Sequence, residues 1–534
     1  MKIHFLTFFI LILYSCSAID RQEQPNRPNI LFALADDASF PYMGAYGTDW
    51  IATPAFDRVA KEGLLFMNAY VPNSKCSPAR ASILTGRNSW QLEAGANHIV
   101  HWPKKYKTFT DALSQNGYHV GYTGRGYVPW VNGTRQSISG KAYNQQKKEV
   151  PTEHINSIDY AANFDTFLAE REENQPFYFW YTSSEPHRRY EFKSGARLAG
   201  KKPSDIDRIP AFWPDNDSVR HDLLDHAYEI EYFDQQLERM LKKLEQLGEL
   251  DNTLVVITAD NGMPFPRAKG QAYEVSSHMP LAIMWKEGIN NPGRIIKDYV
   301  SFIDFAPTFL EVAQVTAENN PMHHITGKSL SGIFYSEEEN ITGEGKDYVL
   351  LGKERHDTGR PEDRGYPIRG IVKDGFLYLH NFEPDRWPAG NPETGYTNAA
   401  SGPTKTFILQ ANRKGYSQDH WQYCFGKRPQ EELFDLTNDP DNIYNLADSP
   451  EHAERKNTMR EELFERLKEE GDPRMYGNGE VFENYEYARQ NSRNLYSRFL
   501  AGDSTLHWAW IDSTDVEWDR LDWIRKEYNI DLSR

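Results

Sequence analysis

The chain has 534 residues, of which 39% are hydrophobic and 13% aromatic, enough for a large packed interior. Its formal net charge of -17 argues against nonspecific nucleic-acid binding, because an acidic surface repels a polyanion. An anionic ligand then needs a local cluster of arginine and lysine, since salt screens charges over about 8–10 Å. We therefore expect no nucleic-acid partner and more than one structural unit.

The N-terminus has the pattern of an export signal. Lys2 precedes an apolar run over 5–14 that is too short to span a bilayer. The segment that ends at Cys16 resembles the bacterial lipobox, in which the cysteine is lipidated after cleavage; an ordinary signal peptide with an incidental cysteine is the alternative. We assign 1–24 to this segment and its tether. We expect an exported protein in the periplasm or at the cell surface, anchored to the outer membrane if Cys16 is lipidated.

Four continuous apolar runs in the first part of the chain end in polar loops, over 28–37, 117–126, 176–187 and 252–262. Runs without polar alternation are typical of strands buried on both faces of a parallel sheet. Apolar residues with helical spacing lie between them, most clearly over 223–244 before Gly248. This alternation predicts an α/β domain over 25–345, with a mostly parallel sheet covered by helices.

The second part of the chain has shorter elements. A hairpin is predicted over 366–382, and an amphipathic helix over 454–470. We therefore expect a smaller antiparallel α+β subdomain over 346–480. The remainder, 481–534, is rich in Tyr, Trp, Arg and Asp and is predicted to wrap the surface as an extension.

Carboxylates directly follow two of the apolar runs, as Asp36-Asp37 and as Asp260-Asn261. Because the carboxyl ends of parallel strands meet at one sheet edge, these side chains are expected to lie together. Three carboxylates and one amide oxygen form an all-oxygen set that suits Ca²⁺ or Mg²⁺ better than zinc. Simple capping of the strand ends is the alternative.

The chain has three cysteines, and with Cys16 in the leader only Cys76 and Cys424 remain. Two cysteines are too few for a disulfide framework or a thiolate zinc site. Cys76 is then a buried filler, half of a bridge to Cys424, or a reactive residue.

The stretch from Cys76 to Arg80, Cys-Ser-Pro-Ala-Arg, resembles the signature of type I sulfatases. The resemblance covers most of the chain, including "RPNILFALADD", "TADNGMPFP" and "ELFDLTNDPDNIYNLA". It implies an alkaline-phosphatase-like fold, Ca²⁺ as cofactor, and oxidation of Cys76 to formylglycine by a maturation enzyme during export. Within this family, the chain resembles the branch of the heparan N-sulfatases, which also includes bacterial polysaccharide sulfatases. The implied substrate is therefore a sulfated glycan, with its sulfate as an ester or an N-sulfo group.

The same resemblance implies roles for individual residues. One hydroxyl of the hydrated aldehyde attacks sulfur, and the other later expels sulfate. Arg80 would hold the formylglycine hydroxyl, His187 would be a general acid, and Lys269 would bind sulfate. The implied metal ligands are Asp36, Asp37, the modified Cys76, Asp260 and Asn261.

One element departs from the family pattern at two positions. Where the family has Gly-Lys-x-His, this chain has Gly124-Arg125-Gly126-Tyr127. Arg125 keeps a positive charge near the sulfate, although its geometry differs from that of lysine. Tyr127 cannot replace the histidine as an acid–base group, so either His187 acts alone or another histidine, His98 or His278, takes the second role.

Glycan contacts are predicted from a run of basic residues over 352–370 and from its surroundings. Arginine pairs with uronate carboxylates, and an aromatic ring such as Trp387 stacks on a sugar face. The predicted substrate-binding residues are His98, Arg355, His356, Arg369 and Arg386. A solvated loop of mixed charge is the alternative.

Two other functions remain open. A phosphatase or phosphodiesterase of the same superfamily shares the fold, but such enzymes use Ser or Thr with two zinc ions, and Cys76-x-Pro-x-Arg80 argues against them. A sulfated-glycan-binding protein without catalysis is suggested by Tyr127, and the intact Cys76, Arg80 and metal set argue against it.

Overall fold

The computed structural model describes residues 27–338, 346–503, 505–506, 511–518 and 526. The predicted signal, the lipidation of Cys16 and the tether lie outside these residues. Within the described part of the chain, no helix has the length and apolar character needed to cross a membrane.

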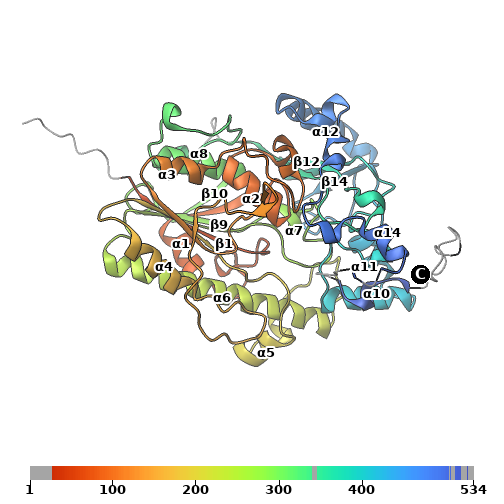
Figure 1. Cartoon of the computed structure of the whole chain (residues 1–534). Coiled ribbons are helices and arrows are strands. Elements are labelled where there is room, and N and C mark those ends of the chain that lie inside the picture. The colour runs from red at the N-terminus through yellow and green to blue at the C-terminus, as the bar shows by residue number, and fades with distance from the viewer. Residues whose placement is uncertain (1–26, 339–345, 504, 507–510, 519–525, 527–534) are drawn as a thin grey trace, which may run out of the picture.

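An eight-stranded sheet forms the centre of the larger part of the chain (Figure 1). Seven of its strands are parallel to one another, and β9 runs antiparallel to both of its neighbours. In spatial order the strands are β10 (Arg294–Ser301), β2 (Leu64–Tyr70), β9 (Leu281–Met284), β8 (Thr253–Ala259), β1 (Asn29–Ala35), β7 (Phe177–Thr182), β3 (His119–Gly124) and β6 (Lys141–Ala142).

The four predicted apolar runs are β1, β3, β7 and β8, which lie next to one another in the sheet. Every residue of β1, β7 and β8 is buried, as expected for strands that are covered on both faces. All four strands run in the same direction, so their carboxyl ends meet at one edge.

Helices cover both faces of this sheet (Figure 1). One face carries α2 (Cys76–Thr85), α3 (Phe109–Gln115) and α8 (Phe305–Val312), and the other carries α1 (Pro54–Glu62), α4 (Tyr160–Glu170) and α6 (Asp217–Leu247). As predicted, α6 ends at Gly248, whose φ of 70° gives the left-handed cap. The short α5 (Ser194–Ala199) packs on α6.

A second, four-stranded antiparallel sheet follows in the chain. Its strands are β11 (Tyr348–Lys353), β12 (Ile368–Lys373), β13 (Phe376–Asn381) and β14 (Glu431–Asp435). The predicted hairpin is β12–β13, in which Lys373 pairs with Phe376 across the turn.

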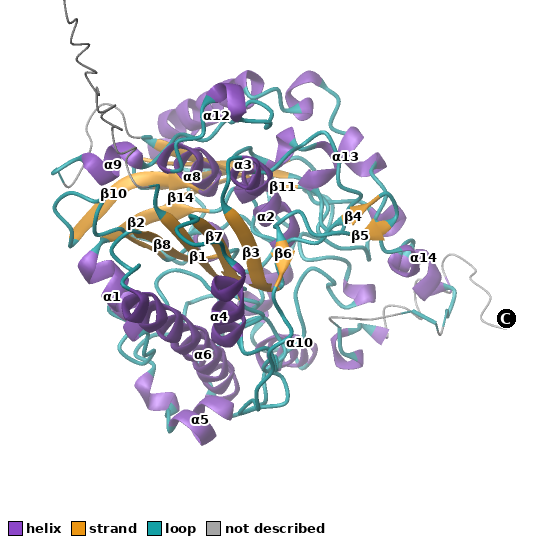
Figure 2. Cartoon of the chain, turned by 60° about the vertical axis from the view of Figure 1, so that its left-hand side comes forward, coloured by secondary structure: helices purple, strands orange, loops and turns teal. Residues whose placement is uncertain are grey.

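Alternating side chains of β11 pack in opposite directions. Leu351 packs with Tyr70 and Tyr273 of the part that is built around the eight-stranded sheet, which we call the larger unit. Leu350 packs with Leu463 of α12 (Ala453–Glu469). The small sheet is therefore a layer between the larger unit and the predicted amphipathic helix, which lies above β14 in Figure 2. The predicted fold class is confirmed, while the predicted boundaries at 345 and 480 stay predictions.

Short elements complete the described chain: the hairpin β4 (Trp130–Val131) and β5 (Thr134–Arg135), and the helices α7 (Glu274–Ser277), α9 (Ser331–Tyr335), α10 (Pro403–Arg413), α11 (Gln418–Phe425), α13 (Val481–Asn484) and α14 (Leu495–Leu500). The segment after α13 returns to the larger unit, where Ala488 N donates to Ile99 O and Tyr487 packs beside Ile99. This contact brings the C-terminal part of the chain to the edge where the central strands end.

Candidate active site

The predicted acidic cluster is present at the carboxyl ends of β1 and β8. These strands are neighbours, with Ala35 opposite Ala259, so the residues that follow them face each other. Asp36, Asp37 and Asp260 are each 0% exposed. Oxygen atoms of the three carboxylates and Cys76 Sγ lie within 4.8 Å of one another.

Cys76 is the first residue of α2, with Sγ 3.6 Å from Asp36 Oδ1 and 3.9 Å from Asp37 Oδ1. The helix N-terminus places unpaired backbone N–H groups and a positive dipole at this position. Burial raises the pKa of the Cys76 thiol to about 12, so the unmodified side chain is neutral at neutral pH. Cys424 is a separate free cysteine whose Sγ donates to Phe212 O, so the alternative of a Cys76–Cys424 disulfide is wrong.

Three cationic side chains meet the carboxylates. Their contacts are Arg80 Nε to Asp260 Oδ2 at 2.9 Å, Lys269 Nζ to Asp37 Oδ2 at 2.6 Å, and an ion pair between Arg125 and Asp36. Although burial opposes it, the charges of Arg125 and Arg80 hold the pKa of Asp36 well below its usual range. Burial, with Asp36 and Asp260 beside it, raises the pKa of Asp37 to about 7 despite Lys269.

The cluster fits a hard divalent cation. Asn261 Nδ2 donates to Asp37 Oδ1 at 2.6 Å, while Asn261 Oδ1 is buried with no hydrogen-bond partner among the described residues. A buried oxygen without a donor is costly, and a cation satisfies it. Carboxylate and amide oxygens are the ligands that Ca²⁺ and Mg²⁺ prefer. The predicted ligands Asp36, Asp37, Asp260 and Asn261 are therefore brought together with residue 76.

His187 follows β7 and reaches the same cluster. Its Nδ1 donates to Arg188 O at 2.7 Å, and its Nε2 lies 3.9 Å from Asp37 Oδ2. Arg188 is anchored on α6 by two 2.7 Å bonds to Asp222, which fixes the loop that carries His187. Burial, with Lys269 and Arg125 nearby, lowers the pKa of His187 well below its usual value, so its ring is neutral here.

His226 on α6 is a site residue that the sequence did not identify. Its Nε2 donates to the backbone oxygen of Asp37 at 2.9 Å. Asp37 has a φ of 77°, in the left-handed region that few residues other than glycine adopt. The bond holds that carbonyl and so orients the carboxylate. A histidine within the apolar stripe over 223–244 was the available signal.

A pocket of about 180 Å³ opens over Cys76. Its walls come from the start of α2, from the segments after Asn97 and Gly124, from the β4–β5 hairpin, and from the C-terminal segment. Four arginines line it, and among the described residues no carboxylate does. These arginines are Arg80, Arg125, Arg135 and Arg489. Arg135, Arg489 and the neighbouring Trp130 were not predicted.

His98 lines this pocket and belongs to a buried network. Its Nδ1 lies 2.8 Å from Asp357 Oδ1, and Asp357 also forms an ion pair with Lys75 Nζ at 2.7 Å and accepts from Tyr487 OH at 3.3 Å. Against the effect of burial, Lys75 and His98 hold the pKa of Asp357 well below its usual range, so this carboxylate is ionised. Nδ1 therefore carries the proton, and Nε2 is the nitrogen available to the pocket.

Two further facts define the histidines. Burial lowers the pKa of His98 to about 4, so its imidazole is a neutral acceptor at Nε2. His278, the other histidine considered from the sequence, stacks between Phe40 and Tyr70 with ring centroids 4.0 Å and 4.6 Å away, and its Nδ1 bonds Glu274. It is not a lining residue of the pocket, so the geometry favours His98.

The other predicted substrate-binding residues do not line the pocket. Arg369 and His356 are 0% exposed, and Arg369 is neutralised by Asp472 at 2.7 Å and Glu354 at 2.8 Å. His356 Nε2 is bonded to Asn73. Both side chains are closed off from a glycan in this structure, so their assignment as substrate-binding residues gains no support here and stays a prediction.

Arg355 and Arg386 lie elsewhere as well. Arg355 is 3% exposed beneath the ring of Tyr487, and its backbone oxygen accepts from His98 N. Arg386 pairs with Glu483 at 2.7 Å. Both side chains therefore contact residues of the C-terminal part of the chain, to which they themselves belong. Neither lines the pocket over residue 76.

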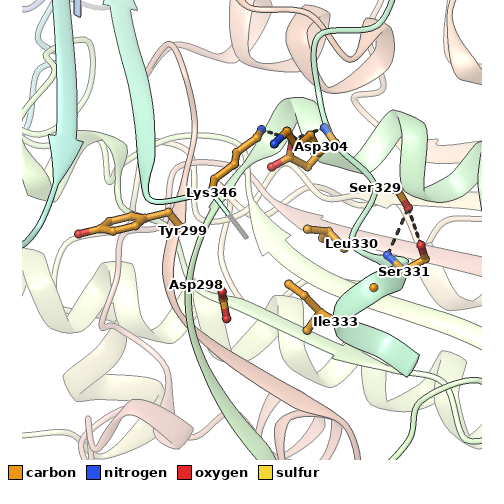
Figure 3. Close-up of a pocket in the computed structure, with 10 residues that line it drawn as sticks. Asp298, Tyr299, Asp304, Ser329, Leu330, Ser331, Ile333 and Lys346 are labelled. Carbon is orange, nitrogen blue, oxygen red and sulfur yellow. Dashed lines mark hydrogen bonds and ion pairs between the residues drawn. The ribbon is translucent and has the colours of Figure 1, made fainter. Parts of the chain in front are cut away.

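A larger pocket of about 300 Å³ lies away from this site, between β10 and the segment around α9 (Figure 3). One of its two carboxylates, Asp304, pairs with Lys346 and accepts from the backbone of Ser301 and Lys328. These contacts close the chain around the end of β10. None of the predicted site residues lines this pocket, so it is not the candidate active site.

Comparisons with known proteins agree with the site. Residues 28–315 match the family model described as Sulfatase, a span that contains residue 76 and all the predicted metal ligands. The human N-sulphoglucosamine sulphohydrolase is 27% identical over 493 residues, which covers 87% of this chain and 93% of that protein. An ulvan-active sulfatase of Formosa agariphila is 25% identical over 494 residues, covering 84% and 76%.

Solved structures show the fold. A complex described as containing D-glucosamine-2-N,6-O-disulfate as its substrate superposes with a TM-score of 0.58 at 19% identity, covering 84% of this chain and 98% of that one. A phosphonate monoester hydrolase of Agrobacterium radiobacter superposes at 0.62 with 17% identity, covering 83% and 96%. At such identities the likeness concerns the fold alone, which is alkaline-phosphatase-like, as predicted. The chemistry is decided by the site.

Proposed function

Because this chain belongs to the sulfatase family and is a sulfatase, we propose that it removes sulfate esters or N-sulfo groups from a sulfated polysaccharide or its oligosaccharides. One observation carries this proposal: Cys76 begins α2 beside three buried carboxylates, under a pocket that four arginines line. An arginine-lined pocket in a chain of net charge -17 suits an anionic substrate. The matched relatives include proteins named for glucosamine and ulvan sulfates.

We propose that residue 76 works as formylglycine and that the acidic cluster holds Ca²⁺. The neutral, buried thiol is a poor nucleophile, whereas a hydrated aldehyde supplies two hydroxyl groups at the same place. The ligands would be Asp36, Asp37, Asp260 and Asn261, whose oxygens suit a hard cation. When bound, the cation polarises a sulfate oxygen and lowers the pKa of a hydroxyl at residue 76.

The cationic side chains bind and orient the sulfate. Lys269 brings positive charge to the cluster beside Asp37, and Arg125 does so beside Asp36. Arg80, which donates to Asp260 in the same cluster, holds a hydroxyl group of the formylglycine at residue 76. Arg125 takes the place of the family lysine, and its side chain is 36% exposed toward the pocket. These positive charges compensate the sulfate group for the hydration that it loses when it enters the site.

His187 and His98 divide the proton transfers in this proposal. Both rings are neutral in the ligand-free protein, and an entering sulfate adds the negative charge that raises a histidine pKa. His187, beside Asp37, then donates a proton to the leaving oxygen. His98, held by Asp357, accepts the proton when sulfate leaves residue 76.

We also propose that the protein is exported, as the pattern over 5–14 indicates, and that lipid on Cys16 anchors it. Formylglycine at residue 76 requires a maturation enzyme that acts before the chain folds, because this residue is buried in the folded protein. Labelling with palmitate, compared with a Cys16→Ala variant, tests the anchor.

The test of the function is desulfation of a panel of heparin-type and algal sulfated oligosaccharides, followed as released sulfate. We expect activity on at least one class and none in Cys76→Ala. Matched aryl sulfate and aryl phosphate compare the two ester types, and intact-mass analysis reads the modification at residue 76. Phosphatase activity that exceeds sulfatase activity would contradict the proposal. So would fully active protein in which residue 76 is still an unmodified cysteine.

A further inference from the structure

Two of the four arginines that line the pocket over Cys76 do not pair with the acidic cluster. Arg80 and Arg125 are occupied by the buried carboxylates at the base of the pocket. Arg135 and Arg489 also line the pocket, but neither forms an ion pair with any residue that the structure describes. Two cations of the pocket thus have no anionic partner in the described part of this otherwise acidic protein.

These two arginines come from segments that are far apart in the sequence and are fixed separately. Arg135 Nε donates to Val128 O at 3.0 Å, and its guanidinium lies 5.0 Å from the ring of Trp130, its partner in the β4–β5 hairpin. Arg489 directly follows Ala488, whose N–H donates to Ile99 O at 2.9 Å. Ile99 is itself a lining residue, so the C-terminal segment is fastened at the pocket rim.

The charges of the two side chains act on each other. Burial lowers the pKa of Arg135, and the positive charges of Arg489 and Arg125 lower it further. Like charges that face one another without a carboxylate between them are relieved by an anion. The ring of Trp130, over which the Arg135 guanidinium lies, places an aromatic surface directly beside this charge.

We propose that Arg135, Arg489 and Trp130 form a subsite for a second anionic group of the substrate, a carboxylate or a second sulfate, carried by the sulfated sugar or its neighbour. This inference rests on the proposed function, because it concerns the same pocket and the same glycan. It gives the substrate class: a sugar unit with at least two negative charges. A guanidinium binds either anion through paired N–H donors.

Two matched pairs of compounds distinguish the two anions. Glucosamine 6-sulfate against glucosamine 2-N,6-O-disulfate tests a second sulfate. A sulfated uronate–glucosamine disaccharide against its uronate methyl ester tests a carboxylate. Calorimetry on full-length Cys76→Ala protein gives the Kd of each compound without turnover. We expect the dianionic member of at least one pair to bind about tenfold to a hundredfold more tightly, as a charged hydrogen-bonded contact allows.

The same titrations are repeated with Arg135→Gln and Arg489→Gln added singly and together. The double variant is expected to bind both members of the preferred pair within about twofold, and the preference of the parent is expected to fall as salt rises. Arg197→Gln is the matched control, because this arginine on α5 is 52% exposed, pairs with Glu191 at the surface and does not line the pocket. It should keep the preference, and melting temperatures verify that every variant is folded.

Equal binding within both pairs in the parent, or a preference that survives in the double variant, overturns the subsite. Turnover of the same compounds by protein with an intact residue 76 is read separately. If the dianion is preferred in binding but no compound loses sulfate, the subsite stands and the proposed substrate falls. If sulfate is released with no preference for a second charge, the proposed function stands and the subsite falls.

Discussion

Position 127 is one of the two positions at which this chain departs from the sulfatase pattern. Tyr127 OH is buried without a hydrogen-bond partner among the described residues, and burial raises its pKa, so it neither gives nor takes a proton at neutral pH. His98 lines the same pocket and has what the tyrosine lacks, a ring nitrogen that is oriented by a carboxylate. Asp357 orients the His98 ring and fixes its proton on Nδ1, as a buried carboxylate does for the histidine of a catalytic triad.

We therefore expect His98→Ala to lower kcat by about 10²–10⁴-fold, the usual contribution of a general base. Because release of sulfate from residue 76 does not involve the alcohol, sugar sulfates and an activated aryl sulfate should be affected alike. In contrast, His187→Ala should impair sugar sulfates more than the aryl sulfate, whose leaving group needs no proton. Steady-state kinetics on both substrates measure this difference.

Added imidazole separates chemistry from structure in that experiment. It should restore part of the activity of His98→Ala, since the lost ring leaves space beside Asp357. The control is His154→Ala, at a histidine that forms only a weak pair with Glu153 and lies outside the pocket. An unchanged kcat in His98→Ala, or a loss of activity that added imidazole does not restore in part, contradicts the role of His98 as general base.

Single residues also show what the sequence could predict of the site. Asp36 and Asp260 were predictable because each follows a recognisable buried strand, and strand ends meet. A dense run of charges in the sequence says nothing about which way each side chain faces, and the structure buries Arg369 against Asp472 and Glu354. Arg489 had no signal at all, since it reaches the pocket only through the path of the C-terminal segment.

Among the elements, the central strands were predictable and the outer ones were not. β1 and β8 are buried on both faces, so they read as unbroken apolar runs. β10 alternates buried and exposed residues, and the four-residue β9 is too short for a pattern. The start of α1 was equally hidden, because its cap comes from a helix far along the chain.

That cap gives a prediction about pH. Asp234 on α6 accepts from Ala55 N at 2.9 Å and Phe56 N at 2.8 Å, at the start of α1. Burial raises the pKa of Asp234 to about 7, above that of an unfolded aspartate. A carboxyl with a raised folded pKa contributes stability at low pH that is lost as the pH rises from about 4 to about 7.

Asparagine does not titrate and has one acceptor oxygen, whereas both oxygens of Asp234 accept a backbone N–H here. Asp234→Asn should therefore be less stable than the parent at pH 4.5, with one backbone N–H left without an acceptor, and the deficit should shrink toward pH 7.5. Melting temperatures across this range measure it. The control is Asp165→Asn, whose carboxylate on α4 is 51% exposed. A deficit that grows with pH would mean that Asp234 is already ionised in the fold.

At the scale of the whole molecule, the site is where distant parts of the chain meet. The larger unit supplies the acidic cluster and residue 76, the small-sheet region supplies Asp357, and the segment after α13 supplies Tyr487 and Arg489. Three carboxylates with no exposed surface are a cost to folding that the proposed cation would offset. Metal binding and the stability of the whole protein should therefore be coupled.

We expect Ca²⁺ to raise the melting temperature of chelator-treated protein by a few degrees, because a ligand of the folded state at about 100 times its Kd adds about 2.7 kcal/mol. Asp260→Asn should abolish both this shift and turnover, since it removes one buried anionic ligand. Asp304→Asn is the matched control: this aspartate is also buried, but it pairs with Lys346 away from the cluster, so the Ca²⁺ response should remain. If Asp260→Asn keeps the full Ca²⁺ shift, or if calorimetric scans of the parent do not respond to Ca²⁺ after chelation, the cluster does not hold this cation.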